Sequence, residues 1–162
     1  GRPDCFRGLP TRPGQLRPSR GGSIHLRDAD PFAAPRIAPN ILKEAEDRQT
    51  LLAGMRIARD LTRAEPMAAF IDSEDTPGAQ VDSDEALLEY AANTGATVYH
   101  PVGTCKMGND PMAVVDENLR VHGMQGLRVV DASVMPRLVS GNTNAPTIMI
   151  AGKAADMIKA SV

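Results

Sequence analysis

The segment Leu127-Arg128-Val129-Val130-Asp131-Ala132-Ser133 is an apolar stretch that ends in a carboxylate. Its leucine and β-branched side chains predict a buried strand over 127–130. A carboxylate at the carboxyl end of a strand is well placed to accept hydrogen bonds from the hydroxyl groups of a ligand. Capping of the next turn is an equally common use for such an aspartate. Asp131 is therefore a candidate ligand-binding residue with a structural alternative.

The next distinctive segment is Ser140-Gly141-Asn142-Thr143-Asn144-Ala145-Pro146-Thr147. Asn142 and Asn144 are two residues apart, so both side chains can face the same side of an extended segment. The amide of an asparagine can donate a hydrogen bond to an alcohol oxygen and support its negative charge. The alternative is that both are ordinary turn and N-cap residues.

A helix is predicted immediately after this turn, over residues 146–159. Pro146 suits its first turn, where the missing N–H is tolerated. Apolar residues then recur at helical spacing, at Ile148, Ala151, Ala155 and Ile158. The positive end of this helix would point back at the asparagines, where it can stabilise anionic charge.

A single histidine offers proton-transfer chemistry in the segment Tyr99-His100-Pro101-Val102-Gly103-Thr104-Cys105-Lys106-Met107-Gly108. Histidine titrates near neutral pH, so His100 could accept a proton from an alcohol and return it. Residues 97–99 are β-branched and aromatic, which predicts a strand leading into it. A structural histidine bonded to a loop carbonyl is the alternative. His25 and His122 lie in a polar strand face and a turn, so we expect both to be surface residues.

Upstream, residues 1–22 are rich in glycine, proline and arginine and predict a loop. Alternation over 23–27 predicts a short strand, and Pro35 and Pro39 predict extended backbone over 35–40. Helical periodicity predicts one helix over 44–64. A second is predicted over about 83–94, opened by an Asp82–Glu85 capping box.

The composition is that of a globular protein, with 42% hydrophobic and 23% charged residues in a chain of 162. The net charge of −2 provides no basic surface for nucleic acid or an anionic membrane. No apolar run approaches the ~20 residues of a membrane span. We therefore expect no nucleic-acid partner and no membrane span.

The two cysteines, Cys5 and Cys105, form no Cys-x-x-Cys motif. Together with the lack of a signal-peptide pattern, they favour a cytoplasmic location. A zinc site made of His100, Cys105 and His122 would lack a fourth ligand, so we expect no metal. No Gly-x-Ser-x-Gly, P-loop or His-Glu-x-x-His motif points to a hydrolase or a nucleotidase.

In this order, the segments resemble the C-terminal region of the glucose-methanol-choline (GMC) oxidoreductases, nearest to choline-dehydrogenase-like and primary-alcohol-dehydrogenase-like bacterial members. The most distinctive match is the ten-residue stretch 99–108. Further matching segments are 16–18, 23–27, 30–32, 114–116, 121–123, 126–133, 141–151 and 153–156. The resemblance therefore covers nearly the whole chain from about residue 16.

The resemblance implies that FAD is the cofactor and that an alcohol is oxidised by hydride transfer to the flavin. His100 matches the histidine usually assigned as the catalytic base. Asn142 matches the second active-site position, which hydrogen-bonds the alcohol oxygen. Positions that match residues lining FAD or its flavin ring are Asp131, Ala132, Asn144 and Ala145.

The implied fold is α+β, with three parts along the chain. Residues 1–22 are a loop-rich segment. Residues 23–125 resemble part of a substrate-binding domain with an antiparallel sheet and helices. Residues 126–162 resemble the C-terminal strand and helix that complete an FAD-binding domain.

The chain departs from the family pattern because it has no Gly-x-Gly-x-x-Gly turn to hold a dinucleotide. The expected partner is therefore the missing N-terminal FAD-binding portion, in the same or another chain. Two hypotheses follow: part of an FAD-dependent alcohol dehydrogenase or oxidase that makes an aldehyde from a primary alcohol, or a truncated non-catalytic remnant that serves as a partner-binding module. The alcohol is choline-like or uncharged; with no Trp, two Tyr and three Phe, the sequence reveals no aromatic cage for a cation.

Overall fold

The computed structural model describes residues 8–19 and 21–161. They fall into two compact units: unit 1 contains residues 8–15 and 41–95, and unit 2 contains residues 16–19, 21–40 and 96–161. The described residues form three α-helices, two short 3-10 helices and a two-stranded antiparallel sheet. The predicted α+β class is confirmed.

The loop-rich segment predicted over 1–22 contains no helix or strand in its described part. Residues 1–7 and 20, which include Cys5, lie outside the described residues. Of the helices in the described ranges, none has the length and apolar character that crossing a bilayer requires.

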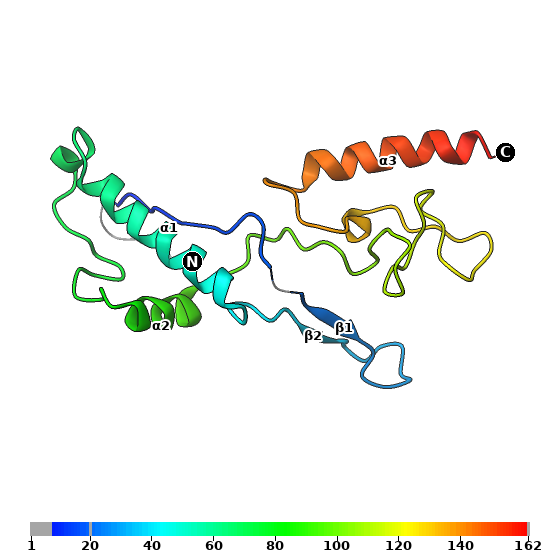
Figure 1. Cartoon of the computed structure of the whole chain (residues 1–162), viewed down its shortest axis with the longest axis horizontal. Helices are drawn as coiled ribbons and strands as arrows, with labels where there is room; N and C mark the ends of the chain where they lie inside the picture. Colours follow the sequence, from blue (N-terminus) through cyan, green and yellow to red (C-terminus); the bar gives the residue numbers. More distant parts are fainter. Residues whose placement is uncertain (1–7, 20, 162) are drawn as a thin grey trace. The chain divides into compact units, whose positions relative to one another are not determined.

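Unit 1 is built from helices α1 (Ala45–Arg63) and α2 (Asp84–Thr94), with the short 3-10 helix η1 (Met67–Phe70) between them (Figure 1). The helices predicted over 44–64 and 83–94 are thus confirmed. The two helices contact each other, and each buries one leucine, Leu52 in α1 and Leu87 in α2.

The N-terminus of α2 differs by one residue from the predicted capping box. The N-cap is Ser83, whose Oγ accepts a 3.2 Å hydrogen bond from the N–H of Ala86. Asp82 instead pairs with Arg59 of α1, with 3.1 Å between Oδ1 and Nη1. The prediction of Asp82 as the cap was wrong because a nearly buried guanidinium competes for its carboxylate.

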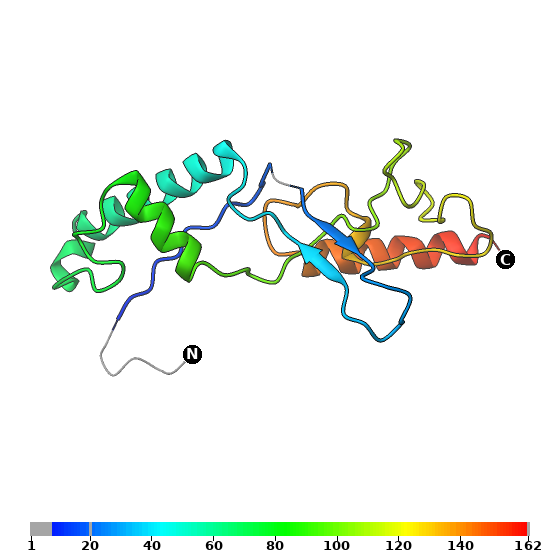
Figure 2. The same cartoon turned by 90° about the horizontal axis from the view of Figure 1, so that it is seen from below.

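The sheet belongs to unit 2 and consists of β1 (Ser23–His25) and β2 (Arg36–Ala38), which are drawn as arrows in Figure 2. The two strands pair antiparallel, with Ile24 opposite Ile37. The strand predicted over 23–27 exists but ends at His25. Leu26 follows it and is 88% exposed.

The hydrophobic core of unit 2 lies between helix α3 (Asn144–Lys159) and the irregular chain that precedes it. Ala154 of α3 packs with Val115, Leu119 and Val134, all of them buried. Val134 belongs to the 3-10 helix η2 (Ala132–Val134). The helix predicted over 146–159 is confirmed and begins two residues earlier.

Two predicted strands of unit 2 differ in the structure. Residues 97–99 are not a strand: Val98 and Tyr99 are 75% and 82% exposed, and the φ of Tyr99 is +62°. Residues 127–130 contain only an isolated bridge, in which Arg128 pairs with Arg120. Strand propensity is expressed only where a neighbouring strand supplies hydrogen-bond partners, and among the described residues neither segment has a full one.

Candidate functional site

The imidazole of His100 lies beside Thr143, the N-cap residue of α3. Its Nδ1 is 3.0 Å from Oγ1 of Thr143 and 3.5 Å from the backbone N–H nitrogen of the same residue. His100 is half-buried, whereas Thr143 is only 8% exposed. The fold therefore brings the candidate base next to the residue that follows Asn142.

Local backbone geometry directs His100 to this position. The N–H of Tyr99 donates a 3.1 Å hydrogen bond to Oγ1 of Thr97, and Tyr99 then adopts a positive φ. A left-handed residue bends the chain, so His100 follows a bend and not the predicted strand. Beyond it, Gly103 has a φ of +88°, a conformation that favours glycine.

No side chain caps the N-terminus of α3 among the described residues. Thr143 is its N-cap, but the hydroxyl makes no capping hydrogen bond, and Pro146 has no N–H to offer. Among the described residues, no hydrogen bond uses the backbone N–H groups of Asn144 or Ala145. Two free donors at the positive end of a 16-residue helix form a site that favours negative charge.

The remaining predicted residues of this turn are accessible. Asn142, Asn144 and Ala145 are all exposed. Just before them, Nε of Arg17 donates a 2.6 Å hydrogen bond to Oγ of Ser140, which ties a distant segment of unit 2 to the turn. The side-chain amides of Asn142 and Asn144 are thus accessible to a ligand, and the hydrogen bond from Arg17 to Ser140 holds the start of the turn.

Asp131 and Ala132 lie at the start of η2. Oδ1 of Asp131 accepts a 2.7 Å hydrogen bond from the N–H of Ser133, so this carboxylate caps η2. Asp131 is exposed and Ala132 is half-buried. The capping role and a ligand-binding role are compatible, because one carboxylate oxygen is sufficient for the cap.

The segment after His100 is hydrogen-bonded to η2. The N–H groups of Cys105 and Met107 donate to the carbonyls of Ser133 and Val134, at 3.0 and 2.9 Å. The segment 99–108, which carries His100, and the segment 131–134, which carries Asp131 and Ala132, are therefore neighbours.

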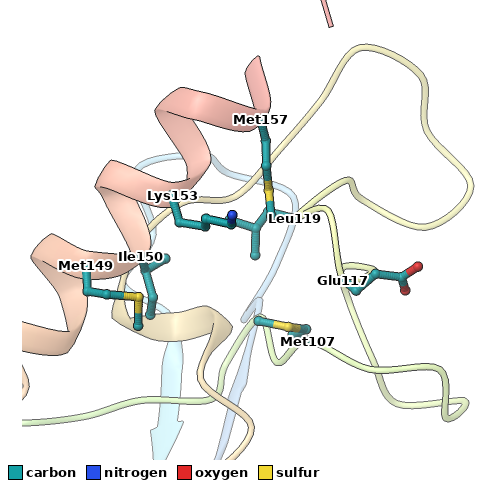
Figure 3. Close-up of a pocket in the computed structure, with 7 residues that line it drawn as sticks. All are labelled: Met107, Glu117, Leu119, Met149, Ile150, Lys153 and Met157. Atoms are coloured by element: carbon teal, nitrogen blue, oxygen red, sulfur yellow. The ribbon is translucent and has the colours of Figure 1, made fainter. Parts of the chain in front are cut away.

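A small open pocket of about 150 Å³ lies elsewhere in unit 2, between α3 and the chain that carries Met107 and Leu119. Figure 3 shows Met149, Lys153 and Met157 projecting into it from α3. None of the predicted site residues lines this pocket. The candidate site is thus an exposed turn with a flanking histidine, and the pocket is a separate apolar groove.

Two carboxyl groups of unit 2 have a lowered pKa. Nζ of Lys106 and the N–H of Met112 hydrogen-bond Asp110 and lower the pKa of its carboxyl. The N–H groups of Arg120 and Asn118 likewise lower the pKa of Asp116. Both residues close turns, so these shifts concern stability and not proton transfer.

The other two histidines, His25 and His122, are surface residues. Nε2 of His122 donates a 2.9 Å hydrogen bond to the carbonyl of Gly108 and is exposed, as is His25 in β1. In the ranges 8–19 and 21–161, no three His, Cys, Asp or Glu residues gather in a group that could hold a metal ion.

One residue of the site was missed by the sequence-based prediction, namely Thr143. The available signal was Pro146 three positions later, because a proline there has no N–H to donate to the threonine oxygen, which can then bond another partner.

Comparison with known proteins gives a consistent result. Residues 18–151 match the sequence description of the family called GMC oxidoreductase. The chain is similar to an alcohol dehydrogenase [acceptor] of Pseudomonas putida, with 49% identity over 88% of this chain and 26% of that protein. It is also similar to an oxygen-dependent choline dehydrogenase of Escherichia coli, with 43% identity over 90% of this chain and 26% of that protein.

Among solved structures, the chain resembles an FAD-dependent oxidoreductase from Chaetomium thermophilum. The TM-score is 0.84 and the identity is 30%, over 90% of this chain and 26% of that one. The chain thus spans about a quarter of the length of the proteins that it matches.

Proposed function

Because this chain belongs to the GMC oxidoreductase family, we propose that it is the C-terminal part of an FAD-dependent dehydrogenase or oxidase that converts a primary alcohol into an aldehyde. The names of the sequence relatives, an alcohol dehydrogenase and a choline dehydrogenase, support alcohol oxidation in general. The FAD-dependent structural relative supports FAD as the cofactor.

The observation that carries the proposal is the meeting of His100 with the turn at the start of α3, through the 3.0 Å contact of Nδ1 with Thr143. That contact occupies one nitrogen of the ring and leaves Nε2 for a substrate. Nε2 takes the proton of the alcohol hydroxyl, so the O–H bond breaks and an Nε2–H bond forms. Asn142 donates a hydrogen bond to the alcohol oxygen as its negative charge develops.

The start of α3 fits a flavin ring. The free N–H groups of Asn144 and Ala145, together with the positive end of the helix dipole, favour the negative charge that a reduced flavin carries. When bound, FAD supplies the acceptor for the hydride that leaves the alcohol carbon. Asp131 and Ala132 would contribute to the cofactor site from η2, where the free oxygen of Asp131 can accept a hydrogen bond.

The substrate is a small alcohol, either choline-like or uncharged. The partner of the chain is an N-terminal FAD-binding portion, in the same polypeptide or in another one. We expect the protein to work in the cytoplasm.

The first test is the colour of the protein. The purified chain should have no flavin absorbance, and the chain joined to or mixed with an N-terminal FAD-binding portion should be yellow and bleach when an alcohol is added. A completed protein that remains colourless would instead support the non-catalytic remnant.

The second test concerns His100. In the completed protein, His100→Ala should slow flavin reduction by the alcohol by ~10²-fold or more. His122→Ala is the matched control, because His122 bonds a backbone carbonyl at the surface of the same unit. Equal rates for the two variants would remove His100 from the mechanism.

A further inference from the structure

The hydroxyl of Thr143 has an unusual hydrogen-bond partner for an N-cap residue. A threonine at a helix N-cap normally accepts a hydrogen bond from the N–H of the second or third helical residue. In α3 the third residue, Pro146, has no N–H, the N–H of the second residue, Ala145, makes no hydrogen bond among the described residues, and the hydroxyl of Thr143 makes no cap. Its oxygen lies 3.0 Å from Nδ1 of His100 instead.

The backbone conformation of Thr143 is also unusual for an N-cap residue. An N-cap residue usually has extended φ and ψ angles, whereas Thr143 has helical values of −84° and −7°. Its carbonyl still accepts hydrogen bonds from the N–H and the hydroxyl of Thr147, at 3.0 and 2.6 Å. The backbone carbonyl of Thr143 therefore accepts a hydrogen bond from the helix, while its side chain contacts His100.

The two groups of Thr143 that face Nδ1 differ in the ring tautomers that they allow, and the hydroxyl is compatible with both tautomers because it can donate or accept. The backbone N–H can only donate, so on its own it would favour a lone pair on Nδ1 and the proton on Nε2. The hydroxyl can also accept, so it alone permits a proton on Nδ1 and a lone pair on Nε2. Its contact is shorter, at 3.0 Å against 3.5 Å.

We propose that Thr143 is a positioning residue: its hydroxyl accepts a hydrogen bond from Nδ1–H of His100 and so leaves the lone pair on Nε2 to take the alcohol proton. This inference rests on the function proposed above. The Nδ1–H is present both in the neutral base and in the imidazolium that proton uptake produces. One hydrogen bond therefore holds the ring before and after the O–H bond breaks and the Nε2–H bond forms.

The chain itself provides the first test, through the ring nitrogens of His100 in protein labelled with ¹⁵N-histidine. Long-range ¹H–¹⁵N spectra, recorded where the imidazole is neutral, report the fraction of each tautomer. Thr143→Val removes the hydroxyl and keeps the shape, so the fraction with the proton on Nδ1 should fall. Thr143→Ser keeps the hydroxyl and should retain the wild-type fraction.

Thr147→Val is the matched control, because it removes a hydroxyl that bonds the same helix start without contacting His100. Its His100 spectrum should equal that of the wild type. Far-UV circular dichroism verifies that each variant is folded. The same tautomer fraction in Thr143→Val and the wild type would overturn the proposal, and so would an equal change in Thr147→Val.

The second test is kinetic and uses the completed protein. Thr143→Val should lower kcat by about 10-fold and leave KM near its wild-type value, because a misplaced base affects the transition state more than substrate binding. Thr143→Ser should restore kcat. If Thr143→Val and Thr147→Val have the same kcat, Thr143 does not position the base for reaction.

The two proposals fail separately. If His100→Ala leaves flavin reduction intact, the proposed function is wrong whatever the tautomer spectra report. If His100→Ala slows reduction but Thr143→Val changes neither the tautomer nor kcat, only the role of Thr143 is wrong.

Discussion

The backbone N–H of Met107 donates a 2.9 Å hydrogen bond to the carbonyl oxygen of Val134. This bond joins the segment that follows His100 to η2, which begins directly after Asp131. The side chain of Val134 is fully buried in the core beneath α3. The predicted base and the predicted cofactor residues therefore depend on one small core.

Val134→Ala should lower the free energy of unfolding by about 2 kcal/mol, because a fully buried side chain is truncated and leaves a cavity. Urea denaturation of the chain measures this change. Val98→Ala is the control, since that side chain is 75% exposed and should have little effect. Equal midpoints for the two variants would contradict the assignment of this core.

Asn142→Ala should slow alcohol oxidation by the completed protein by ~10²-fold, the typical effect of losing one donor to a developing oxyanion. The FAD content should not change, because Asn142 is expected to face the alcohol. Anaerobic stopped-flow absorbance gives the rate, and the visible spectrum gives the FAD content. Loss of FAD without a change in rate per flavin would place Asn142 at the cofactor instead.

Arg59→Ala should lower the free energy of unfolding by about 3 kcal/mol, because a nearly buried charge pair loses one partner. Arg59 binds both carboxylate oxygens of Glu74 and the carbonyls of Gly78 and Val81, so it fastens the loop before α2 to α1. Denaturant titration gives the free energy, and limited proteolysis of residues 72–82 gives the opening of the loop.

The control for Arg59 is Arg56→Ala, which lies one turn earlier in α1 and pairs with Asp84 at the surface. Half of its side chain is exposed, so its loss should change stability little. If the loop resists the protease equally in Arg59→Ala and Arg56→Ala, Arg59 does not anchor the loop to α1.

Stability should also fall at acidic pH through Asp116. Hydrogen bonds from the N–H groups of Arg120 and Asn118 lower the pKa of its carboxyl in the folded state. A lowered pKa means that this contribution is complete above the unfolded value of about 4 and is lost as pH falls through the folded value. Unfolding free energies measured between neutral and acidic pH check this expectation.

Asp116→Asn keeps an oxygen that can accept both hydrogen bonds but does not titrate, so its stability should depend less on pH. Asp110→Asn should act in the same direction, because Lys106 and the N–H of Met112 lower the pKa of Asp110. A double variant with the full wild-type pH dependence would refute both assignments.

Sequence periodicity was sufficient for the three helices. Leu52 and Leu87 lie on buried faces that helical spacing identifies, and a helix makes its backbone hydrogen bonds within its own segment. The face predicted for α3 was wrong: Ile148 and Ile158 are 64% and 42% exposed, and Ala154 is buried instead. The strands over 97–99 and 127–130 were not predictable in the same way. Their residues have strand propensity, but a strand needs hydrogen bonds to a neighbour that local sequence does not specify.

For the site, the sequence by itself determined which groups can do chemistry: the imidazole of His100, the amide of Asn142 and the positive end of a helix that begins near Pro146. Only the tertiary structure decided that the imidazole and the helix start meet, through Nδ1 of His100 and the hydroxyl of Thr143. Residue type and local conformation are encoded in neighbouring residues, whereas a contact between positions 100 and 143 exists only after the chain between them has packed around its core.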